Sequence, residues 1–411
     1  MPHYLALGEM PAKKHTLFST SRGEECFEEF IGEEGFSSTG SLLYHTRVPS
    51  SLVDSRPWDL GATTTKENRP LLPHHYRLHD LVPDDDEPRD AVRDRVLVLG
   101  NSDVNIRYVS ANTASPLYSN AVGDEVVFVE SGSATLQTVF GEVEVRQGDN
   151  VVIPRVTIHR WVPGDDGPLR LYCVEAAGHI NPPAKYLSRF GQFLEGSPLT
   201  ERDLRTPTAI LLAPEDQADD DTEVYVKHRG DDGVTGSVVV YDHHPFDVVG
   251  WDGQLYPYAF NYRDFAPVTG QLIQPPPTYQ ILEGDGFVVC NFVPRMLEYH
   301  PRAIKVPYYH SNVDSDEVMF YFAGETAARE GSGIRDGSVS LHPAGYTHGP
   351  GRKAYLESVN HTESKETAFM VDTFRPLRLA DAVAGCEDTR YPWTWSGRGP
   401  LGGSPAEATA G

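Results

Sequence analysis

Two histidines and one glutamate in the second half of the chain, His310, Glu317 and His348, are side chains of the types that bind first-row transition metals. Two imidazoles and one carboxylate on one face hold Fe(II) or Mn(II) and leave about three coordination positions open. A reaction that brings O2 and a second substrate to one ion needs such open positions. We therefore expect these three residues to form the reactive centre of the chain.

The three residues belong to a pattern of polar, proline and glycine positions that occurs twice. The second copy comprises His310, Asn312, Glu317, Gly324, Gly337, Pro343, Gly345 and His348. The first copy comprises Tyr118, Asn120, Glu125, Gly132, Gly148, Pro154 and His159. Because the spacing within the two copies is nearly the same, we interpret them as an internal repeat of one structural unit.

Short runs of Val, Ile, Leu, Phe and Tyr surround both copies and predict β-strands. They are residues 95–99, 125–129, 134–139, 151–154 and 169–174 in the first half, and 224–227, 237–241, 287–292, 317–322, 338–342 and 368–372 in the second. Glycine and proline are frequent, with 37 and 32 residues, and helical patterns are scarce. The sequence therefore predicts an all-β protein made of sandwiches or barrels.

Two acidic, proline-containing segments, residues 83–92 and 214–223, predict solvated loops. The second of them is the best candidate for a domain boundary. We expect an N-terminal domain over residues 1–213, which begins with an irregular arm, and a C-terminal domain over residues 224–380. Residues 381–411 end in a stretch of low complexity, and we expect them to be mostly disordered.

Charge and cysteine content exclude several classes of function. Asp and Glu number 59 against 35 Lys and Arg, which gives a net charge of −24. Such a charge disfavours binding to nucleic acids and anionic membranes, and no apolar run is long enough to span a bilayer. The four cysteines lie far apart, so neither a disulfide framework nor a thiolate zinc site is expected. We expect a cytoplasmic protein that acts on small molecules.

The repeat resembles the two sequence motifs of the cupin superfamily, G-x5-H-x-H-x3,4-E-x6-G and G-x5-P-x-G-x2-H-x3-N. The second copy has Asn312 where the motif has its second histidine, and it lacks the final asparagine. The resemblance implies a bicupin, with two double-stranded β-helix (jelly-roll) barrels in one chain. It also implies that His310, Glu317 and His348 are metal ligands of the second barrel. Tyr118 replaces the first histidine in the first barrel, which we expect to bind no metal.

Three longer segments resemble the homogentisate 1,2-dioxygenases, a family within the cupins. Residues 306–312, VPYYHSN, resemble the P-P-Y-Y-H-R-N segment of that family. Residues 340–350, SLHPAGYTHGP, resemble S-L-H-x-x-x-T-P-H-G-P, and residues 247–258 resemble D-V-V-x-W-x-G-x-x-x-P-Y. The resemblance extends from about residue 27 to about residue 380.

This resemblance implies a non-haem Fe(II) dioxygenase that inserts both atoms of O2 into a substituted hydroquinone and opens its ring. With homogentisate the product is maleylacetoacetate, in the degradation of tyrosine and phenylalanine. Carried over to this sequence, the resemblance implies that the iron ligands are His310, Glu317 and His348. The residues expected to support them are His342, Tyr309 and Asn312. The family forms trimers that pair into hexamers, so we expect a homo-oligomer.

Three features depart from the family pattern. Ser311 stands where the family has an arginine after the first ligand. Six residues rather than five separate His310 from Glu317, so Asp316 competes for the ligand role, although the general cupin spacing favours Glu317. The aligned stretch 272–278, LIQPPPT, contains no histidine, whereas the family has one there that contacts the substrate hydroxyl.

These departures leave the substrate open. The residues that could contact it are Tyr308, Tyr346, Arg295, Arg302, His300 and Lys305. We expect one of the basic side chains to replace the missing arginine or histidine and to bind an acidic substituent. The alternatives are the same reaction on gentisate, another hydroquinone or an aminophenol, and a non-catalytic metal-binding bicupin.

Overall fold

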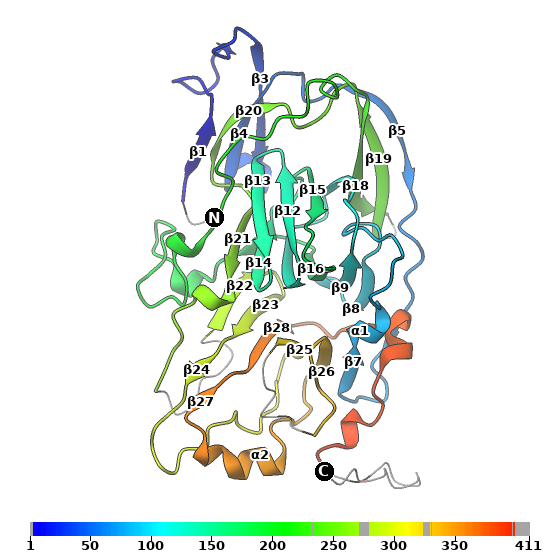
Figure 1. Ribbon diagram of the computed structural model, residues 1–411, viewed down its shortest axis with the longest axis vertical. Helices are drawn as coiled ribbons and strands as arrows, with labels where there is room; N and C mark the ends of the chain where they lie inside the picture. Colours follow the sequence, from blue (N-terminus) through cyan, green and yellow to red (C-terminus); the bar gives the residue numbers. More distant parts are fainter. Residues whose placement is uncertain are drawn as a thin grey trace. The chain divides into compact units, whose positions relative to one another are not determined.

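The computed structural model, drawn in Figure 1, describes residues 3–231, 233–270, 279–323, 329, 331–396 and 398. The chain folds into two compact units. The first comprises Met1–Ala62, Asp85–Val96 and Arg107–Asp264, and the second comprises Thr63–Asp84, Leu97–Ile106 and Phe265–Gly411. Both are built mainly from β-strands, and the prediction of an all-β bicupin is confirmed.

Two sheets form the barrel of the first unit. One has the strand order β13-β12-β15-β10-β18-β19-β5, and the other contains β21-β14-β11-β16-β9. The first sheet comprises β5 (Leu52–Trp58), β10 (Leu117–Asn120), β12 (Ser133–Thr138), β13 (Gly141–Arg146), β15 (His159–Pro163), β18 (Thr222–Gly230) and β19 (Gly233–Tyr241). The second comprises β9 (Val104–Ala111), β11 (Glu125–Ser131), β14 (Asp149–Ile153), β16 (Leu169–Ala176) and β21 (Tyr258–Asn261). Buried side chains from both sheets, such as Leu136, Trp161 and Val127, make one continuous core.

The N-terminal arm forms a third sheet of the same unit, in the order β1-β20-β4-β3-β2. Its strands are β1 (Leu5–Gly8), β2 (Phe18–Ser19), β3 (Glu25–Gly32), β4 (Gly40–His45) and β20 (Val248–Gly253). The short elements of the unit are β17 (Ile180–Asn181) and the 3-10 turns η1 (Glu34–Phe36), η2 (Ala184–Tyr186), η3 (Glu201–Asp203) and η4 (Tyr262–Asp264). Trp251 of β20 is fully buried and donates from its indole nitrogen to the carbonyl of Phe140 at 2.8 Å. This contact ties the arm sheet to the barrel.

The units do not divide at the acidic segment 214–223, where we expected a boundary. β18 follows that segment and pairs in parallel with β10, while β19 pairs with β5. The residues from 224 to 264 therefore belong to the first unit. An acidic composition favours exposure of a segment to solvent, but strand pairing decides which unit the following strands join.

The second unit contains the strand order β22-β23-β28-β25-β26-β7, the neighbouring strands β8-β29-β6 of another sheet, and the pair β24-β27. Its strands are β6 (Thr65–Glu67), β7 (His74–Arg77), β8 (Val96–Gly100), β22 (Gln280–Gly284), β23 (Phe287–Phe292), β24 (Arg295–Met296), β25 (Asp316–Ala323), β26 (Ser338–His342), β27 (Glu363–Ser364), β28 (Thr367–Thr373) and β29 (Arg378–Ala380). Its helical elements are α1 (Leu78–Leu81), α2 (Arg352–Glu357), η7 (Ser358–Asn360), η8 (Asp381–Cys386) and η9 (Tyr391–Trp393). Phe292, Met319 and Met370 belong to its core.

The segment after β29 is folded in its first part, which corrects the expectation of disorder for residues 381–396. This part contains η8 and η9, and Tyr391 within it is fully buried. Residues 399–411, to which the same expectation applied, lie outside the described residues. The aromatic residues near Tyr391 pack on the second unit and give this segment an ordered structure.

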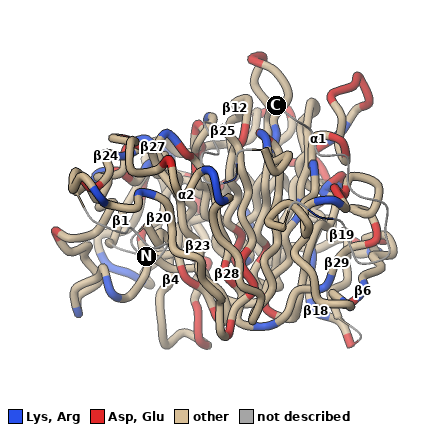
Figure 2. Tube along the Cα trace, turned by 90° about the horizontal axis from the view of Figure 1, so that it is seen from below, with Lys and Arg blue, Asp and Glu red and all other residues tan. Residues whose placement is uncertain are grey.

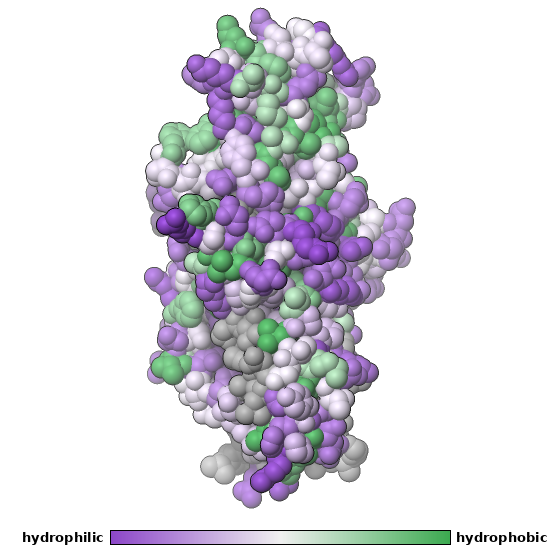
Figure 3. Space-filling model, turned by 90° about the vertical axis from the view of Figure 1, so that its left-hand side faces the viewer, coloured by the Kyte–Doolittle hydropathy of each residue, from purple (hydrophilic) through white to green (hydrophobic). Residues whose placement is uncertain are grey.

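Charged side chains of both signs are interspersed along the chain trace (Figure 2). The face drawn in Figure 3 likewise shows small hydrophobic areas among hydrophilic ones. Within the described part of the chain, no helix is long and apolar enough to cross a membrane.

Candidate metal centre

Glu317, His342 and Asp372 lie next to one another on three neighbouring strands of the second unit. Glu317 is the second residue of β25, and its direct partners are His342 on β26 and Asp372 on β28. Directly opposed residues of antiparallel strands project from the same face of a sheet. The sheet therefore presents one imidazole and two carboxyl groups in a row.

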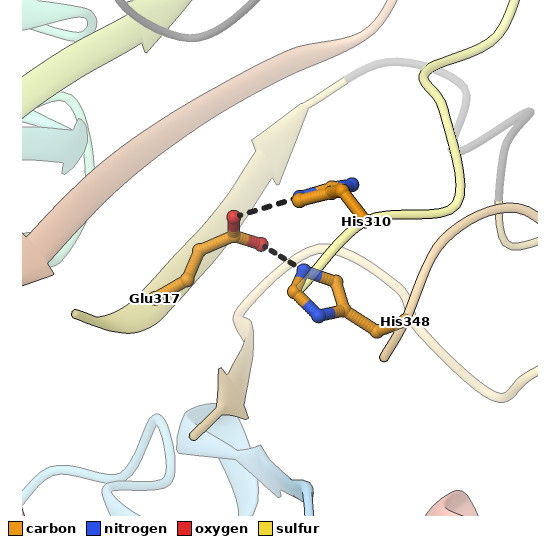
Figure 4. Close-up of side chains that lie close together, drawn as sticks. All are labelled: His310, Glu317 and His348. Atoms are coloured by element: carbon orange, nitrogen blue, oxygen red, sulfur yellow. Dashed lines mark hydrogen bonds and ion pairs between the residues drawn. The ribbon is translucent and has the colours of Figure 1, made fainter. Parts of the chain in front are cut away.

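His310 and His348 reach this row from two loops. They form an antiparallel bridge, in which the backbone N–H of each donates to the carbonyl of the other at 2.9 Å. Figure 4 shows both rings beside the carboxylate of Glu317. Nε2 of His310 lies 3.5 Å from one carboxylate oxygen, and Nε2 of His348 lies 3.2 Å from the other. The structure thus brings together the three residues that the repeat singled out.

The hydrogen bonds of the two rings determine which nitrogen carries the proton. Nδ1 of His310 lies 2.9 Å from the carbonyl oxygen of Tyr308, and Nδ1 of His348 lies 3.0 Å from that of Tyr346. Each Nδ1 therefore donates its proton, which leaves a lone pair on each Nε2. Lone pairs that face a carboxylate are unfavourable without a positive charge between them. The ligand atoms all lie within 4.8 Å of one another, so the three residues fit a metal ion.

The charge of Glu317 adds to this fit. Its side chain is buried, which opposes ionisation, but the neighbouring imidazoles of His310, His342 and His348 hold the pKa of its carboxyl well below its usual range. The same carboxylate raises the pKa of His310. The site therefore holds a buried negative charge that attracts cations.

His342 supports Glu317 and has no nitrogen left for an ion. Its Nδ1 lies 2.9 Å from a carboxylate oxygen of Glu317, and its Nε2 lies 2.8 Å from the hydroxyl of Tyr391. Burial lowers the pKa of His342 to about 4, so the ring is neutral at pH 7. Nδ1–H then donates to Glu317, and Nε2 accepts from Tyr391. Asn312 donates to the other carboxylate oxygen of Glu317 at 3.4 Å.

Asp316 and Glu317 have different surroundings. The two carboxylate oxygens of Asp316 accept hydrogen bonds from the backbone N–H groups of Ala344 and Leu377, each at 2.8 Å. Successive residues of a strand point to opposite faces of the sheet. Asp316 therefore points away from the histidines, and the geometry favours Glu317 as the ligand.

Asp372 is an acidic residue of this site that the repeat pattern does not reveal. Its atom Oδ1 is buried and has no hydrogen-bond partner among the described residues. Burial, together with the negative charge of Glu317 on the next strand, raises the pKa of Asp372 to about 8. The cupin motifs have no position for this residue, because it lies on a strand that follows both of them.

Tyr391 and Trp395 connect the segment after β29 to the same site, and they too were not predicted. Nε1 of Trp395 donates to the carbonyl of Gly349 at 2.9 Å, directly after His348. The guanidinium of Arg329 lies over the ring of Trp395, 3.6 Å from its centre. The run YPWTW at residues 391–395 is the signal that distinguishes this segment from a disordered tail.

A pocket of about 690 Å³ shares its wall with the residues that precede His310. It is lined by Glu298, His300, Arg302, Ala303, Ile304, Val306, Tyr308, Tyr309 and Tyr355. The rings of Tyr309 and Tyr355 stack with their centres 5.5 Å apart. Tyr308, His300 and Arg302, which were predicted to contact the substrate, therefore share one pocket.

Three other residues predicted to contact the substrate are not among the residues that line this pocket. The ammonium group of Lys305 donates to two backbone carbonyls, at 3.2 and 2.6 Å. The guanidinium of Arg295 lies over the ring of Tyr279, 5.6 Å from its centre. The ring of Tyr346 lies 6.5 Å from that of Trp395. The expectation that Lys305 or Arg295 binds an acidic substituent stays a prediction.

The first unit contains the residues of the first repeat copy, in which the phenol of Tyr118 takes the place of the imidazole of His310. Tyr118 and His159 are direct partners on β10 and β15, a pairing that repeats the histidine bridge of the second unit. The hydroxyl of Tyr118 donates to Glu125 at 2.9 Å. Nδ1 of His159 donates to a backbone carbonyl at 2.9 Å, and its Nε2 is buried without a partner in the part of the chain that the structure describes.

Basic side chains contact the carboxylates of this first set. Nη1 of Arg95 lies 2.8 Å from Glu125 and 3.1 Å from Glu175. Nζ of Lys227 contacts the same oxygen of Glu175 at 2.9 Å, and Nε of Arg107 contacts its other oxygen at 3.1 Å. The chain thus supplies from its own side chains the positive charge that a metal ion would bring.

Two family models match the chain. The one described as Homogentisate 1,2-dioxygenase N-terminal matches residues 48–262, and the one described as Homogentisate 1,2-dioxygenase C-terminal matches residues 279–398. Together they cover most of the sequence. The first match lies within the first unit for most of its length, and the second lies within the second unit.

Individual proteins are similar to this chain over different lengths. A candidate dioxygenase of Saccharolobus solfataricus is 36% identical over 400 residues, which cover 96% of this chain and 99% of that protein. The homogentisate 1,2-dioxygenase of Rhodopseudomonas palustris is 32% identical over 293 residues, with 69% of this chain and 59% of that enzyme covered. The structure of salicylate 1,2-dioxygenase from Pseudoaminobacter salicylatoxidans matches with a TM-score of 0.30 and 12% identity, over 80% of this chain and 85% of that one. The chain thus matches less than two thirds of the length of the Rhodopseudomonas enzyme.

Proposed function

The chain belongs to the homogentisate 1,2-dioxygenase family, and on that premise we propose that it is an Fe(II)-dependent dioxygenase that opens the ring of a substituted hydroquinone. With homogentisate the product would be maleylacetoacetate. The observation that carries the proposal is the pair of Nε2 lone pairs, on His310 and His348, that face the buried carboxylate of Glu317. This donor set leaves about three positions of an ion open for substrate and O2.

In this proposal, His310, Glu317 and His348 hold the iron. When bound, Fe(II) supplies a Lewis acid that lowers the pKa of a substrate hydroxyl and a source of electrons for O2. His342 donates to Glu317 and thereby fixes the orientation of its carboxylate. Asn312 donates to the second carboxylate oxygen from the loop before β25. These residues keep the donor atoms in place before substrate arrives.

The pocket beside His310 is the proposed substrate site. Its tyrosine side chains, Tyr308, Tyr309 and Tyr355, offer ring faces and edges that suit a flat aromatic substrate. Arg302 and His300 offer donors for an acidic side chain. A local cation is needed there, because the net charge of −24 disfavours the approach of an anion.

A second candidate is the same reaction on another aromatic compound, such as gentisate, a different hydroquinone or an aminophenol. Ser311 favours it, because its hydroxyl pairs with that of Thr347 at 2.6 Å where the family resemblance would place an arginine. The stretch 272–278, which aligns with the substrate-binding histidine of the family, lies outside the described residues. Among these compounds, Ser311 thus argues for an uncharged hydroquinone or an aminophenol rather than for gentisate, which carries a carboxylate.

The setting of the reaction is part of the proposal. Its partners are O2 and the aromatic substrate, and its pathway with homogentisate is the degradation of tyrosine and phenylalanine. The four cysteines are free, as suits the reducing cytoplasm. We expect a homo-oligomer, a trimer or a hexamer, which light scattering in solution would measure.

Anaerobic reconstitution with Fe(II), followed by O2 uptake with a panel of hydroquinones, tests the proposal. We expect one O2 to be consumed per ring opened, with homogentisate or one of its analogues as the best substrate. If the protein binds iron but no aromatic compound in the panel supports O2 uptake, the proposal is contradicted. The protein would then be a non-catalytic metal-binding bicupin.

A further inference from the structure

Each unit places two carboxylates opposite each other on neighbouring strands at its centre. In the first unit, Glu125 on β11 is the direct partner of Glu175 on β16. In the second, Glu317 on β25 is the direct partner of Asp372 on β28. Because Glu125 and Glu317 hold the same position in the internal repeat, Glu175 and Asp372 correspond to each other as well.

The carboxylate pair of the first unit binds one cation jointly. Nη1 of Arg95 contacts Glu125 at 2.8 Å and Glu175 at 3.1 Å. Lys227 adds a second positive charge on Glu175, at 2.9 Å. The side chains of Arg95 and Lys227 are 2% and 11% exposed, so two buried positive charges balance two buried carboxylates. Arg107, which is 21% exposed, contacts Glu175 from the rim.

The carboxylate pair of the second unit has no such balance. Within the described residues, the ion pairs of Glu317 connect it only to histidines. Asp372 has a buried oxygen, Oδ1, without a hydrogen-bond partner among those residues. Two carboxylates on adjacent strands repel each other in a medium of low dielectric constant. Ionisation of both groups therefore requires a positive charge, and among the described residues Glu317 has no ion pair with a lysine or arginine that would supply it.

We infer that Asp372 is a fourth protein group of the metal centre, which faces the ion together with Glu317 and balances the second charge of a divalent cation. The inference rests on the metal site of the proposed function. It extends that site beyond two histidines and one carboxylate to the neighbouring Asp372, whose Oδ1 is buried without a hydrogen-bond partner among the described residues. A divalent ion in the second unit then corresponds in charge to Arg95 and Lys227 in the first.

Metal affinity tests this inference without reference to turnover. The full-length protein is stripped of metal and titrated with Co(II) in competition with a chelator, for the wild type, Asp372→Asn and Asp372→Glu. We expect Asp372→Asn to weaken Co(II) binding by about 10- to 100-fold, as for other groups that tune a metal from beyond its first ligands. Asp372→Glu keeps the charge and should bind Co(II) within a few-fold of the wild type.

Glu366→Gln is the matched control. Glu366 precedes β28 and is half-buried, and desolvation raises the pKa of its carboxyl, so the substitution also removes an acidic group from the second unit. It should leave Co(II) affinity unchanged. Thermal unfolding shows that each variant is folded, and Asp372→Ser replaces Asp372→Asn if the amide does not fold.

Two results would overturn the inference. One is equal Co(II) affinity in Asp372→Asn and the wild type, and the other is an equal loss in Asp372→Asn and Asp372→Glu, which would exclude charge as the cause. A wild-type protein that binds Co(II) tightly but consumes no O2 with Fe(II) would instead contradict the proposed function and leave the role of Asp372 standing.

Discussion

The hydroxyl of Tyr118 donates a hydrogen bond to the carboxylate of Glu125, 2.9 Å away. At the matching place in the second unit, a nitrogen of His310 that carries a lone pair lies 3.5 Å from Glu317. A hydroxyl proton satisfies a carboxylate, whereas a lone pair next to it calls for a cation. Under the proposed function, the two units would therefore differ in their need for metal, although their strands pair in the same way.

Metal analysis should find about one iron per chain, held by the second unit. His310→Ala or His348→Ala should abolish both iron and activity, because the remaining donors bind Fe(II) only weakly. His228→Ala, in a strand of the first unit, should retain both. Full iron content in either ligand variant, or an ordered transition metal at His159, would refute the assignment.

The two adjacent acids should respond differently to substitution. Glu317→Ala should lose iron, because it removes the carboxylate that both histidines face. Asp316→Ala should keep iron but unfold more easily, by about 1–3 kcal/mol, because two backbone N–H groups lose their acceptor. Iron quantification and urea denaturation measure the two effects. The reverse pattern of iron loss would make Asp316 the ligand.

Arg95→Ala should destabilise the protein strongly. The side chain is 2% exposed and bridges Glu125 and Glu175, so its removal leaves buried carboxylates uncompensated, at a cost of about 3–5 kcal/mol. Arg93→Ala is the control, because the side chain of Arg93 is 51% exposed in its ion pair with Asp90. This substitution should lower the free energy of unfolding by less than about 1 kcal/mol. Denaturant unfolding that finds equal losses would argue against a central role for Arg95.

Arg302 should govern selectivity for an acidic substrate. Arg302→Gln should raise the KM for homogentisate by about tenfold, the lower end of the range for a charge-assisted hydrogen bond. The KM for the uncharged methyl ester should change little. Lys305→Gln serves as the control, because its ammonium group is bound to backbone carbonyls and should not affect the difference between acid and ester. Steady-state kinetics with both compounds decides whether Arg302 recognises the charge.

The stability of the first unit should fall in alkaline solution because of His45. Burial alone would lower the pKa of its ring, but the carboxylates of Asp247 and Glu29, at 2.7 and 3.0 Å, raise it to about 9. A raised pKa contributes stability fully below about pH 6.5, and that contribution is lost as the pH rises to about 9. Unfolding free energies between pH 6 and 10 should fall by up to about 3 kcal/mol more in the wild type than in His45→Gln. Parallel curves would show that His45 has no such role.

The residues of the metal centre that lie at fixed spacing could be predicted from the sequence. Glu317 lies on β25, which pairs with β26, and His310 and His348 lie on the loops before β25 and after β26. The pairing of these neighbouring segments keeps the spacing of the three residues nearly constant. The repeat then identified Tyr118 as the position where the first copy differs. The same regular strand runs predicted the fold class.

The remaining parts depend on contacts between segments far apart in the chain. Arg95 meets Glu175, and Trp395 meets Gly349, across distances in sequence that no local pattern encodes. Asp372 is placed by the register of β28 against β25, which the strand's composition does not specify. The boundary expected near residue 214 failed for the same reason, since strand pairing outweighs composition.

Arg95 is part of the polypeptide, whereas the ion that we propose for the second unit would have to be acquired from the surroundings. The buried carboxylates of the first unit are therefore neutralised by its own basic side chains, whether or not iron is available. Under the proposed function, a chain synthesised during iron starvation would contain one unit with its cations in place and one whose Asp372, with a pKa raised to about 8 beside Glu317, stays largely protonated. Protein made without iron should then be cleaved by proteases in the second unit more readily than protein made with iron, and the first unit should be equally resistant in both.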